Sequence, residues 1–257
     1  MHADTGSDSW FICFKPNPAA RLRLFCFPYA GGGASIFQTW ANELPLDVEV
    51  VGIQMPGLER RFMEPPVASL SILVQTLASV IFSKSNKPFG FFGHSFGAFI
   101  SFELARMLSK KAGFRPVHLF VSGIRAPHIP DSNRPIHNLP DDEFLAELHH
   151  RYGGIQDETL QNPDIMRELL PGLRANFKMY ESYDYENCDS LDCPITAFGG
   201  LQDYTVSRAD LEAWHYQTKG TFILHMIPGD HFFIHFERQH FLPTLSDEIN
   251  RTLARLK

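Results

Sequence analysis

Short apolar runs alternate with segments of helical spacing along most of this 257-residue chain. The runs are rich in Val, Ile, Leu and Phe and are bounded by Pro, Gly or polar residues, which is typical of buried strands. They predict strands at 10–14, 22–27, 48–53, 117–123, 195–199 and 221–227, and another that ends at Phe92. Apolar positions three and four apart predict helices at 36–44, 69–82, 98–111, 207–216 and 242–256. This alternation favours a parallel sheet flanked by helices.

The alternation breaks between residues 127 and 185, where no run reads as a strand. The segment opens with four prolines (Pro127, Pro130, Pro135 and Pro140), followed by a predicted helix at 141–150 and helical spacing from 163 onward. An insertion of this length and apolar content favours a helical lid, the alternative being two ordinary crossover helices packed on the sheet. We therefore predict a single α/β domain over residues 1–257 with a helical lid at about 127–185.

Composition excludes several classes of function. The formal charge is −6 and no stripe of Lys and Arg is visible, so a nucleic-acid partner is not expected. Residues 1–9 lack the features of a signal peptide, and no apolar stretch approaches the ~20 residues that span a bilayer. We expect a cytoplasmic protein that does not bind membranes. The cysteines at 13, 26, 188 and 193 match no zinc spacing, so no metal site is expected.

The sequence Gly93-His94-Ser95-Phe96-Gly97 lies between an apolar run and a helical segment. Strand, G-x-S-x-G and helix together are the context of a nucleophile elbow, a tight turn that lifts the serine hydroxyl out of the sheet. The flanking glycines suit a turn too tight for Cβ atoms. A serine in an ordinary glycine-flanked turn is the alternative interpretation. We favour Ser95 as a nucleophile.

A nucleophilic serine needs a base, and the base needs a carboxylate that fixes its tautomer. In the elbow-containing hydrolases these follow in the order Ser, Asp or Glu, His, each on a loop after a late strand. His231 stands in the turn 228–231 directly after the last predicted strand, where the base belongs. His225 lies within that strand, and His235 is the second choice. A purely turn-capping role for His231 is the alternative.

The acid is predicted to be Asp203, which comes directly after the strand at 195–199. Asp184, Asp189 and Asp192 precede that strand and would lie at its opposite end. Asp230 is adjacent in sequence to the predicted base, and neighbouring side chains in a turn rarely face each other. Asp203 could instead cap the helix that follows it.

Acyl transfer also requires donors for an oxyanion. The residue after the nucleophile, Phe96, supplies one backbone N–H, and an early strand-to-helix loop supplies the other. The loop that contains Gly31, Gly32 and Gly33 has this position, which makes Ala30 the expected second donor. Glycine-rich loops also bind phosphate, but neither G-x-G-x-x-G nor the P-loop signature is present.

Taken together, these motifs resemble a type II thioesterase, the free-standing editing enzyme of polyketide and non-ribosomal peptide assembly lines. The resemblance runs from about Trp10 to the C-terminus. It is carried by Phe27-Pro28-Tyr29-Ala30-Gly31-Gly32-Gly33, Pro56-Gly57 with Arg60-Arg61-Phe62, Gly93 to Gly97, Gly199 to Asp203, and Gly229-Asp230-His231-Phe232-Phe233.

The resemblance implies an α/β-hydrolase fold with a triad of Ser95, Asp203 and His231 and oxyanion donors at Ala30 and Phe96. It implies hydrolysis of acyl thioesters on the phosphopantetheine arm of acyl or peptidyl carrier proteins, with no cofactor. Phe96 stands where the family often has Met, which keeps the N–H donor. Leu58 stands where the family often has a polar or basic residue, and no function is transferred to it.

Within the predicted lid, Phe144, Leu148 and Phe177 are candidates to contact the acyl chain, because their spacing gives apolar faces that must be buried. Packing on the sheet alone is the alternative. Three other functions use the same fold: a carboxylesterase or lipase, an acyltransferase, and a binding module without catalysis. We expect a monomer; the preferred acyl chain is not readable from the sequence.

Overall fold

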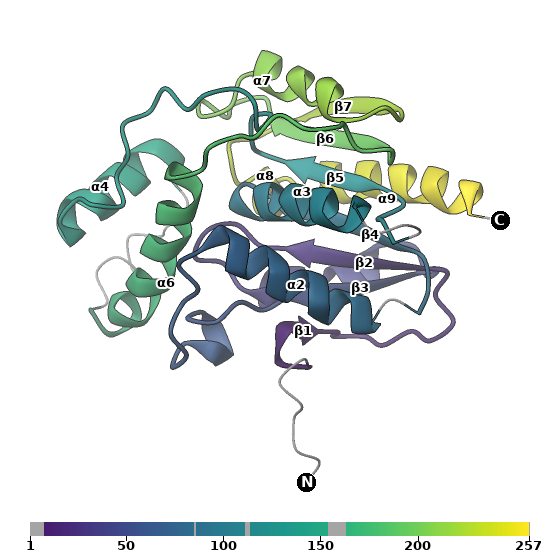
Figure 1. The fold of residues 1–257 in the computed structure, drawn as a ribbon, viewed down its shortest axis with the longest axis horizontal. Coiled ribbons are helices and arrows are strands. Elements are labelled where there is room, and N and C mark those ends of the chain that lie inside the picture. Colours follow the sequence, from purple (N-terminus) through teal and green to yellow (C-terminus); the bar gives the residue numbers. More distant parts are fainter. Residues whose placement is uncertain (1–7, 85, 111–113, 154–162, 257) are drawn as a thin grey trace, which may run out of the picture.

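The computed structural model describes residues 8–84, 86–110, 114–153 and 163–256 (Figure 1). Within these residues a seven-stranded sheet has the order β1-β3-β2-β4-β5-β6-β7. The strands are β1 (Phe11–Ile12), β2 (Leu22–Phe27), β3 (Val48–Ile53), β4 (Phe89–His94), β5 (Leu119–Ser122), β6 (Ile195–Gly200) and β7 (Phe222–Ile227). Strand β1 runs antiparallel to β3, and all other pairs are parallel. The predicted, mostly parallel α/β architecture is confirmed.

Both faces of the sheet are covered by helices, so its central strands are buried throughout. Successive strand residues point to opposite faces. Phe25 and Phe91 pack beneath α2 (Leu70–Lys84) and α3 (Phe96–Ser109), whereas Leu24 and Phe92 face the layer that includes α1 (Trp40–Glu43) and α9 (Arg238–Arg255). Continuous apolar runs, rather than alternating ones, are what strands buried on both faces require.

Two helices extend beyond these layers, α4 (Asp141–Tyr152) and α6 (Pro163–Glu181), although Met179 near the end of α6 belongs to the core beneath α2 and α3. Figure 1 shows them beyond the carboxyl ends of the parallel strands. The described residues between 123 and 190 form no strand. The pair shares a small core of Ile136, Phe144, Leu148, Leu173 and Phe177. We call α4 and α6 the helical insertion.

One arginine ties the helical insertion together. Arg174 on α6 donates to the backbone carbonyls of His137 and Leu139, at 2.6 and 2.8 Å, and to the Asp141 carboxylate at 2.5 Å. Its guanidinium also lies 4.4 Å from the ring centroid of Phe144. Because these contacts fix the first turn of α4 against α6, the far end of α4 is held in a defined place.

Several predicted elements are divided or begin and end at other residues. The segment 36–44 forms η2 (Ala34–Phe37) and α1, and the rings of Phe37 and Trp40, one from each, pack edge-to-face with centroids 5.0 Å apart. The segment 207–216 forms α7 (Arg208–Glu212) and η4 (Ala213–Gln217). The predicted strand at 10–14 is reduced to β1 after η1 (Asp8–Trp10), and the last helix begins at Arg238, after α8 (Phe233–Phe236). A further turn, η3 (Glu59–Arg61), follows β3.

No helix among the described residues is both long and apolar enough to cross a bilayer.

Candidate active site

Ser95 occupies the sharp turn between β4 and α3. Its φ of 51° and ψ of −120° are rarely adopted by a residue with a side chain. The turn is possible because Gly93 and Gly97 have no Cβ. A Cβ at Gly97 would lie 2.1 Å from the Phe27 carbonyl oxygen, and one at Gly93 would lie 2.4 Å from the backbone of Ala98. Only glycine fits at both places. The strained backbone holds the Ser95 side chain at the carboxyl edge of the sheet.

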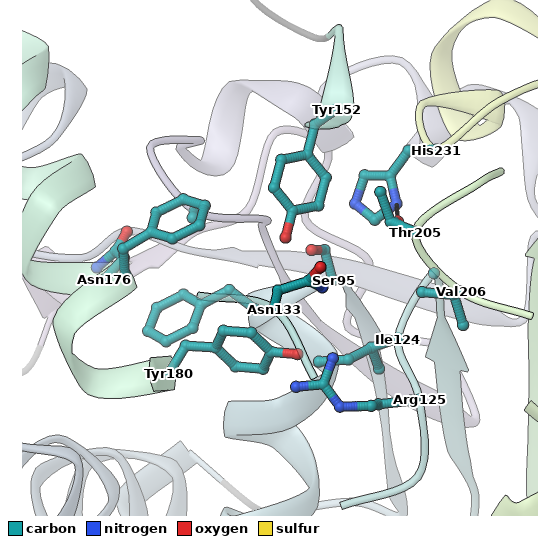
Figure 2. A pocket seen from close by; sticks show the side chains of 14 residues that line it. Ser95, Ile124, Arg125, Asn133, Tyr152, Asn176, Tyr180, Thr205, Val206 and His231 are labelled. Carbon is teal, nitrogen blue, oxygen red and sulfur yellow. Dashed lines mark hydrogen bonds between the residues drawn. The ribbon is translucent and has the colours of Figure 1, made fainter. Parts of the chain in front are cut away.

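His231 and Asp203 form a hydrogen-bonded pair beside this serine. Nδ1 of His231 lies 2.8 Å from Oδ2 of Asp203, and the two side chains are only 5% and 1% exposed. Asp203 follows β6 and His231 follows β7, two adjacent parallel strands, so their loops meet at one edge. Since Nδ1 is bound to the carboxylate, Nε2 is left on the side of the ring that faces Ser95 (Figure 2).

Thr205 holds the second oxygen of that carboxylate. Its hydroxyl and its backbone N–H both donate to Oδ1 of Asp203, at 2.6 and 2.8 Å. Burial alone would raise the pKa of Asp203, but the hydrogen bonds from His231 and Thr205 and the charge of His231 outweigh it and lower the pKa. The carboxylate therefore stays ionised at neutral pH.

The rejected candidates have other structural roles. Asp230 caps its own turn, with Oδ1 accepting from the Phe232 N–H at 2.8 Å. His225 lies in β7 and contacts Glu248 at 2.9 Å. His235 lies 3.0 Å from the Tyr29 hydroxyl. The structure thus brings Asp203, not Asp230, to His231.

His94, the residue before the serine, is fully buried behind His231. Their ring centroids are 5.1 Å apart, and Nδ1 of His94 lies 2.8 Å from the Ser122 hydroxyl. Burial, and then the nearby His231, lower the pKa of His94 well below its ordinary value. A neutral ring therefore lies behind His231, and the pair carries no like-charge repulsion.

Ala30 and Phe96 border the same space as Ser95. Phe96 is the first residue of α3, where a backbone N–H has no partner within the helix. In the glycine-rich loop, the Gly31 N–H donates to Oδ1 of Asn176 at 3.1 Å and the Gly32 N–H to the Tyr29 carbonyl at 3.0 Å. These bonds fix the loop beside Ser95, with Ala30 at its inner edge.

Two cavities meet at Ser95. The larger, about 500 Å³, is here called the apolar cavity. Its apolar lining comprises Leu148, Leu169, Leu173, Phe177, Phe232 and Phe236. The smaller, about 30 Å³, is called the small cavity; it borders Ser95, His231, Thr205, Asn133 and Tyr152 (Figure 2). Both cavities are bordered by Ser95 and His231.

The three candidate lid residues have different positions. Leu148 and Phe177 line the apolar cavity. Phe144 is fully buried inside the helical insertion, where its ring packs at 5.7 Å against Phe177, and it is not among the described residues that line either cavity. Phe144 therefore supports the wall of the cavity from behind.

Sequence reasoning missed three residues of the site. Thr205 secures Asp203, Asn176 secures Gly31, and Tyr152 covers His231 with its ring centroid 5.0 Å away. The role of Thr205 could have been predicted from the sequence, because a hydroxyl two residues after an aspartate often forms a hydrogen bond with that aspartate. The other two come from the helical insertion, more than forty residues from what they touch, and no spacing in the chain indicates them.

The described residues contain no group of three His, Cys, Asp or Glu side chains placed to hold a metal ion. Cys26 and Cys193 are buried, Cys13 is half-buried and Cys188 is exposed.

A parallel sheet with helices on both faces, a serine at a strained turn and an Asp-His pair on the next loops define an α/β-hydrolase. The family model of the thioesterase domain matches residues 22–251. The gramicidin S biosynthesis protein GrsT of Aneurinibacillus migulanus is 46% identical over 247 residues, which cover 96% of each chain.

Comparison with solved structures leads to the same family. The type II thioesterase BorB from the borrelidin biosynthetic cluster has a TM-score of 0.84 and 32% identity, and the match covers 95% of this chain and 99% of BorB. The thioesterase RedJ of the prodiginine pathway in Streptomyces coelicolor has a TM-score of 0.83 and 36% identity, with 90% and 91% covered. The chain belongs to the thioesterase family, and within it to the type II thioesterases.

Proposed function

We propose that this thioester hydrolase removes acyl groups from the phosphopantetheine arm of acyl or peptidyl carrier proteins, with Ser95, His231 and Asp203 as its catalytic triad. The observation that carries the proposal is the meeting of the Ser95 turn and the buried His231–Asp203 pair at the head of one apolar cavity. An acyl chain in that cavity would present its carbonyl carbon to the serine hydroxyl.

The first half of the reaction acylates the enzyme. Ser95 Oγ attacks the thioester carbonyl while Nε2 of His231 takes the hydroxyl proton, and the ionised Asp203 stabilises the imidazolium through Nδ1. The backbone N–H groups of Ala30 and Phe96 bind the developing oxyanion. When the tetrahedral intermediate collapses, the C–S bond breaks and the thiolate takes the proton from His231.

The second half releases the acid. Water gives a proton to His231 and attacks the acyl-serine carbonyl, and the same two N–H groups hold the oxyanion. Collapse breaks the bond between the acyl carbon and Ser95 Oγ, which recovers its proton from His231. A thioester suits this machinery because a thiolate leaves readily.

Carrier proteins are inferred as partners from the relatives. ClbQ comes from the colibactin NRPS/PKS pathway, and YbtT is a type II thioesterase from the yersiniabactin NRPS/PKS biosynthetic pathway. Proteins of such pathways carry their acyl groups as thioesters. The volume of the apolar cavity, about 500 Å³, is compatible with an acyl group rather than a whole folded partner.

The test is a panel of acyl-carrier thioesters of varied chain length and branching, compared with oxygen esters of the same acyl groups. We expect the thioesters to be hydrolysed with the higher kcat/KM, and the free acid to form without any added acceptor. Faster hydrolysis of the oxygen esters would assign a carboxylesterase instead. Product only in the presence of an acceptor nucleophile would assign an acyltransferase. Failure of a fluorophosphonate to label Ser95 would exclude serine catalysis altogether.

A further inference from the structure

We propose that Tyr152 positions the water that hydrolyses the acyl-serine, and that it does so from the helical insertion rather than from the hydrolase core. This inference rests on the proposed function, because it concerns the second half of that reaction. If this is correct, helix α4 takes part in the hydrolysis step as well as forming a wall of the apolar cavity.

The first observation is the division of space around Ser95. The apolar cavity is large enough for an acyl chain, whereas the small cavity, about 30 Å³, has room for water but not for such a chain. The small cavity borders both Ser95 and His231, the two groups between which the hydrolytic water must lie. Once an acyl chain fills the apolar cavity and the thiol has left, the small cavity is the space that remains beside the ester carbonyl.

Tyr152 lies at the boundary between these spaces. It borders both cavities, its ring centroid is 5.0 Å from that of His231, and it is 6.0 Å from that of Phe177. Figure 2 shows the phenol directed from the helical insertion toward Ser95, with the hydroxyl foremost. The ring therefore separates the acyl chain from the small cavity, and the hydroxyl faces that cavity.

Besides Ser95 and His231, the polar side chains that border the small cavity are those of Arg125, Asn133, Tyr152, Asn176, Tyr180 and Thr205, and some of them are already hydrogen-bonded elsewhere. The Thr205 hydroxyl is used on Asp203, and the amide oxygen of Asn176 is used on Gly31. Among the described residues no hydrogen bond involves the hydroxyl of Tyr152 or that of Tyr180, and of these two only Tyr152 also borders the apolar cavity. Burial raises the pKa of Tyr152 to about 12, so the hydroxyl is protonated across the neutral range and can both donate and accept.

Water needs such a partner to attack in the right orientation. One of its O–H bonds must point at Nε2 of His231 and a lone pair at the acyl carbon, which leaves the second O–H to be held. The Tyr152 oxygen can accept that O–H. The step then balances: the water oxygen bonds to the acyl carbon, its proton passes to His231, and the ester bond to Ser95 breaks as Ser95 recovers that proton.

The placement of Tyr152 is fixed by its own helix. It is the last residue of α4, and Gly153 ends the helix with a φ of 65°, in the left-handed region. The preceding residue, Arg151, bonds to the Arg134 carbonyl at 3.0 Å and to Glu147 at 3.1 Å. Together with the Arg174 contacts at the other end of α4, these bonds hold the phenol over the site.

The experiment separates the two half-reactions. Tyr152→Phe keeps the ring that divides the cavities and removes only the hydroxyl. With a chromogenic acyl ester in stopped flow, we expect the acylation phase to stay within about twofold of the parent, whereas steady-state turnover falls about 10- to 100-fold. Turnover should then follow a burst, and intact-mass spectrometry should find the acyl-enzyme accumulated on Ser95. Tyr183→Phe, a matched loss of one phenol oxygen at a residue that bonds to Glu103, should change neither phase.

Three outcomes overturn the inference. Equal losses in both phases would mean that Tyr152 shapes the site as a whole, and unchanged phases would mean that its hydroxyl has no role. A Tyr183→Phe variant with the same burst would make the effect nonspecific. Ser95→Ala is assayed in parallel. If that variant still turns over substrate or forms the acyl-enzyme, the proposed function itself fails. If Ser95→Ala is inactive and Tyr152→Phe behaves like the parent, only the role of Tyr152 is rejected.

Discussion

Nδ1 of His231 lies 2.8 Å from Oδ2 of Asp203, although the two residues are 28 positions apart in the chain. Asp230, the immediate neighbour of His231, is turned away and caps the backbone at Phe232 instead. The pairing follows from the sheet, because β6 and β7 are adjacent and parallel and end at the same edge. This relationship makes Asp203, and not Asp230, the proposed acid of the reaction.

We expect Asp203→Asn to lower kcat by about 10⁴-fold, because an amide no longer stabilises the imidazolium and favours the wrong tautomer of His231. Asp230→Asn should change kcat little, since its oxygen only caps a turn. Steady-state kinetics on one acyl thioester compares the two matched substitutions. A larger loss for Asp230→Asn would reverse the assignment of the acid.

Ser95→Ala and His231→Ala should each reduce turnover by several orders of magnitude, and the double variant should be little worse than either, because the members of a triad act as a unit. The Ser95 side chain is small and only partly buried at its turn, so its loss should leave the melting temperature nearly unchanged. Single-turnover assays and thermal melts provide the two measurements. Additive losses in the double variant would indicate that the residues act independently.

Leu148 and Phe144 offer a matched pair for the role of the helical insertion. Leu148→Trp narrows the apolar cavity, and we expect it to shift the preference between long and short acyl groups by about 1–3 kcal/mol in kcat/KM. Phe144→Ala leaves a hole behind the wall and should cost about 3–5 kcal/mol of stability instead. Acyl-chain panels together with urea unfolding distinguish the two effects. A uniform loss for every substrate in Leu148→Trp would restrict this residue to a structural role.

His118 should make the fold sensitive to mild acid. Burial, with a smaller contribution from Arg255, lowers its pKa to about 3, and the ring is held between Thr252 and Thr196 at 2.7 and 2.9 Å. Between about pH 6.5 and pH 3 the unfolded chain binds a proton here that the folded chain does not, so stability falls as the pH decreases. From pH 7.5 to 5 this group should account for a loss on the order of 2 kcal/mol.

Urea unfolding at the two pH values measures that loss. His118→Asn should lower stability at pH 7.5 yet reduce the difference between the two conditions. The exposed His149, replaced by Asn in the same way, should leave the difference unchanged. Equal pH dependence in the parent and in His118→Asn would contradict the assignment.

The sequence alone determined the order of the elements and the place of the proposed catalytic residues. Continuous apolar runs specify strands buried on both faces, and glycines at 93 and 97 specify a turn that no larger residue fits. The positions of Asp203 and His231 directly after two late strands were enough to predict that they meet, because parallel strands end at one edge. These inferences depend either on residues close together in the chain or on the order and direction of the strands in the sheet.

Only the tertiary structure decided how α4 and α6 sit over that edge. The periodicity of an amphipathic helix says that one face is buried but not against what, so Phe144 and Leu148 looked alike in the sequence. The structure places one inside the helical insertion and the other on the apolar cavity. Tyr152 and Asn176 reach the site because Arg174 and the packing of two helices fix their orientation. Such contacts depend on the angle between packed elements, which no pattern along the chain encodes.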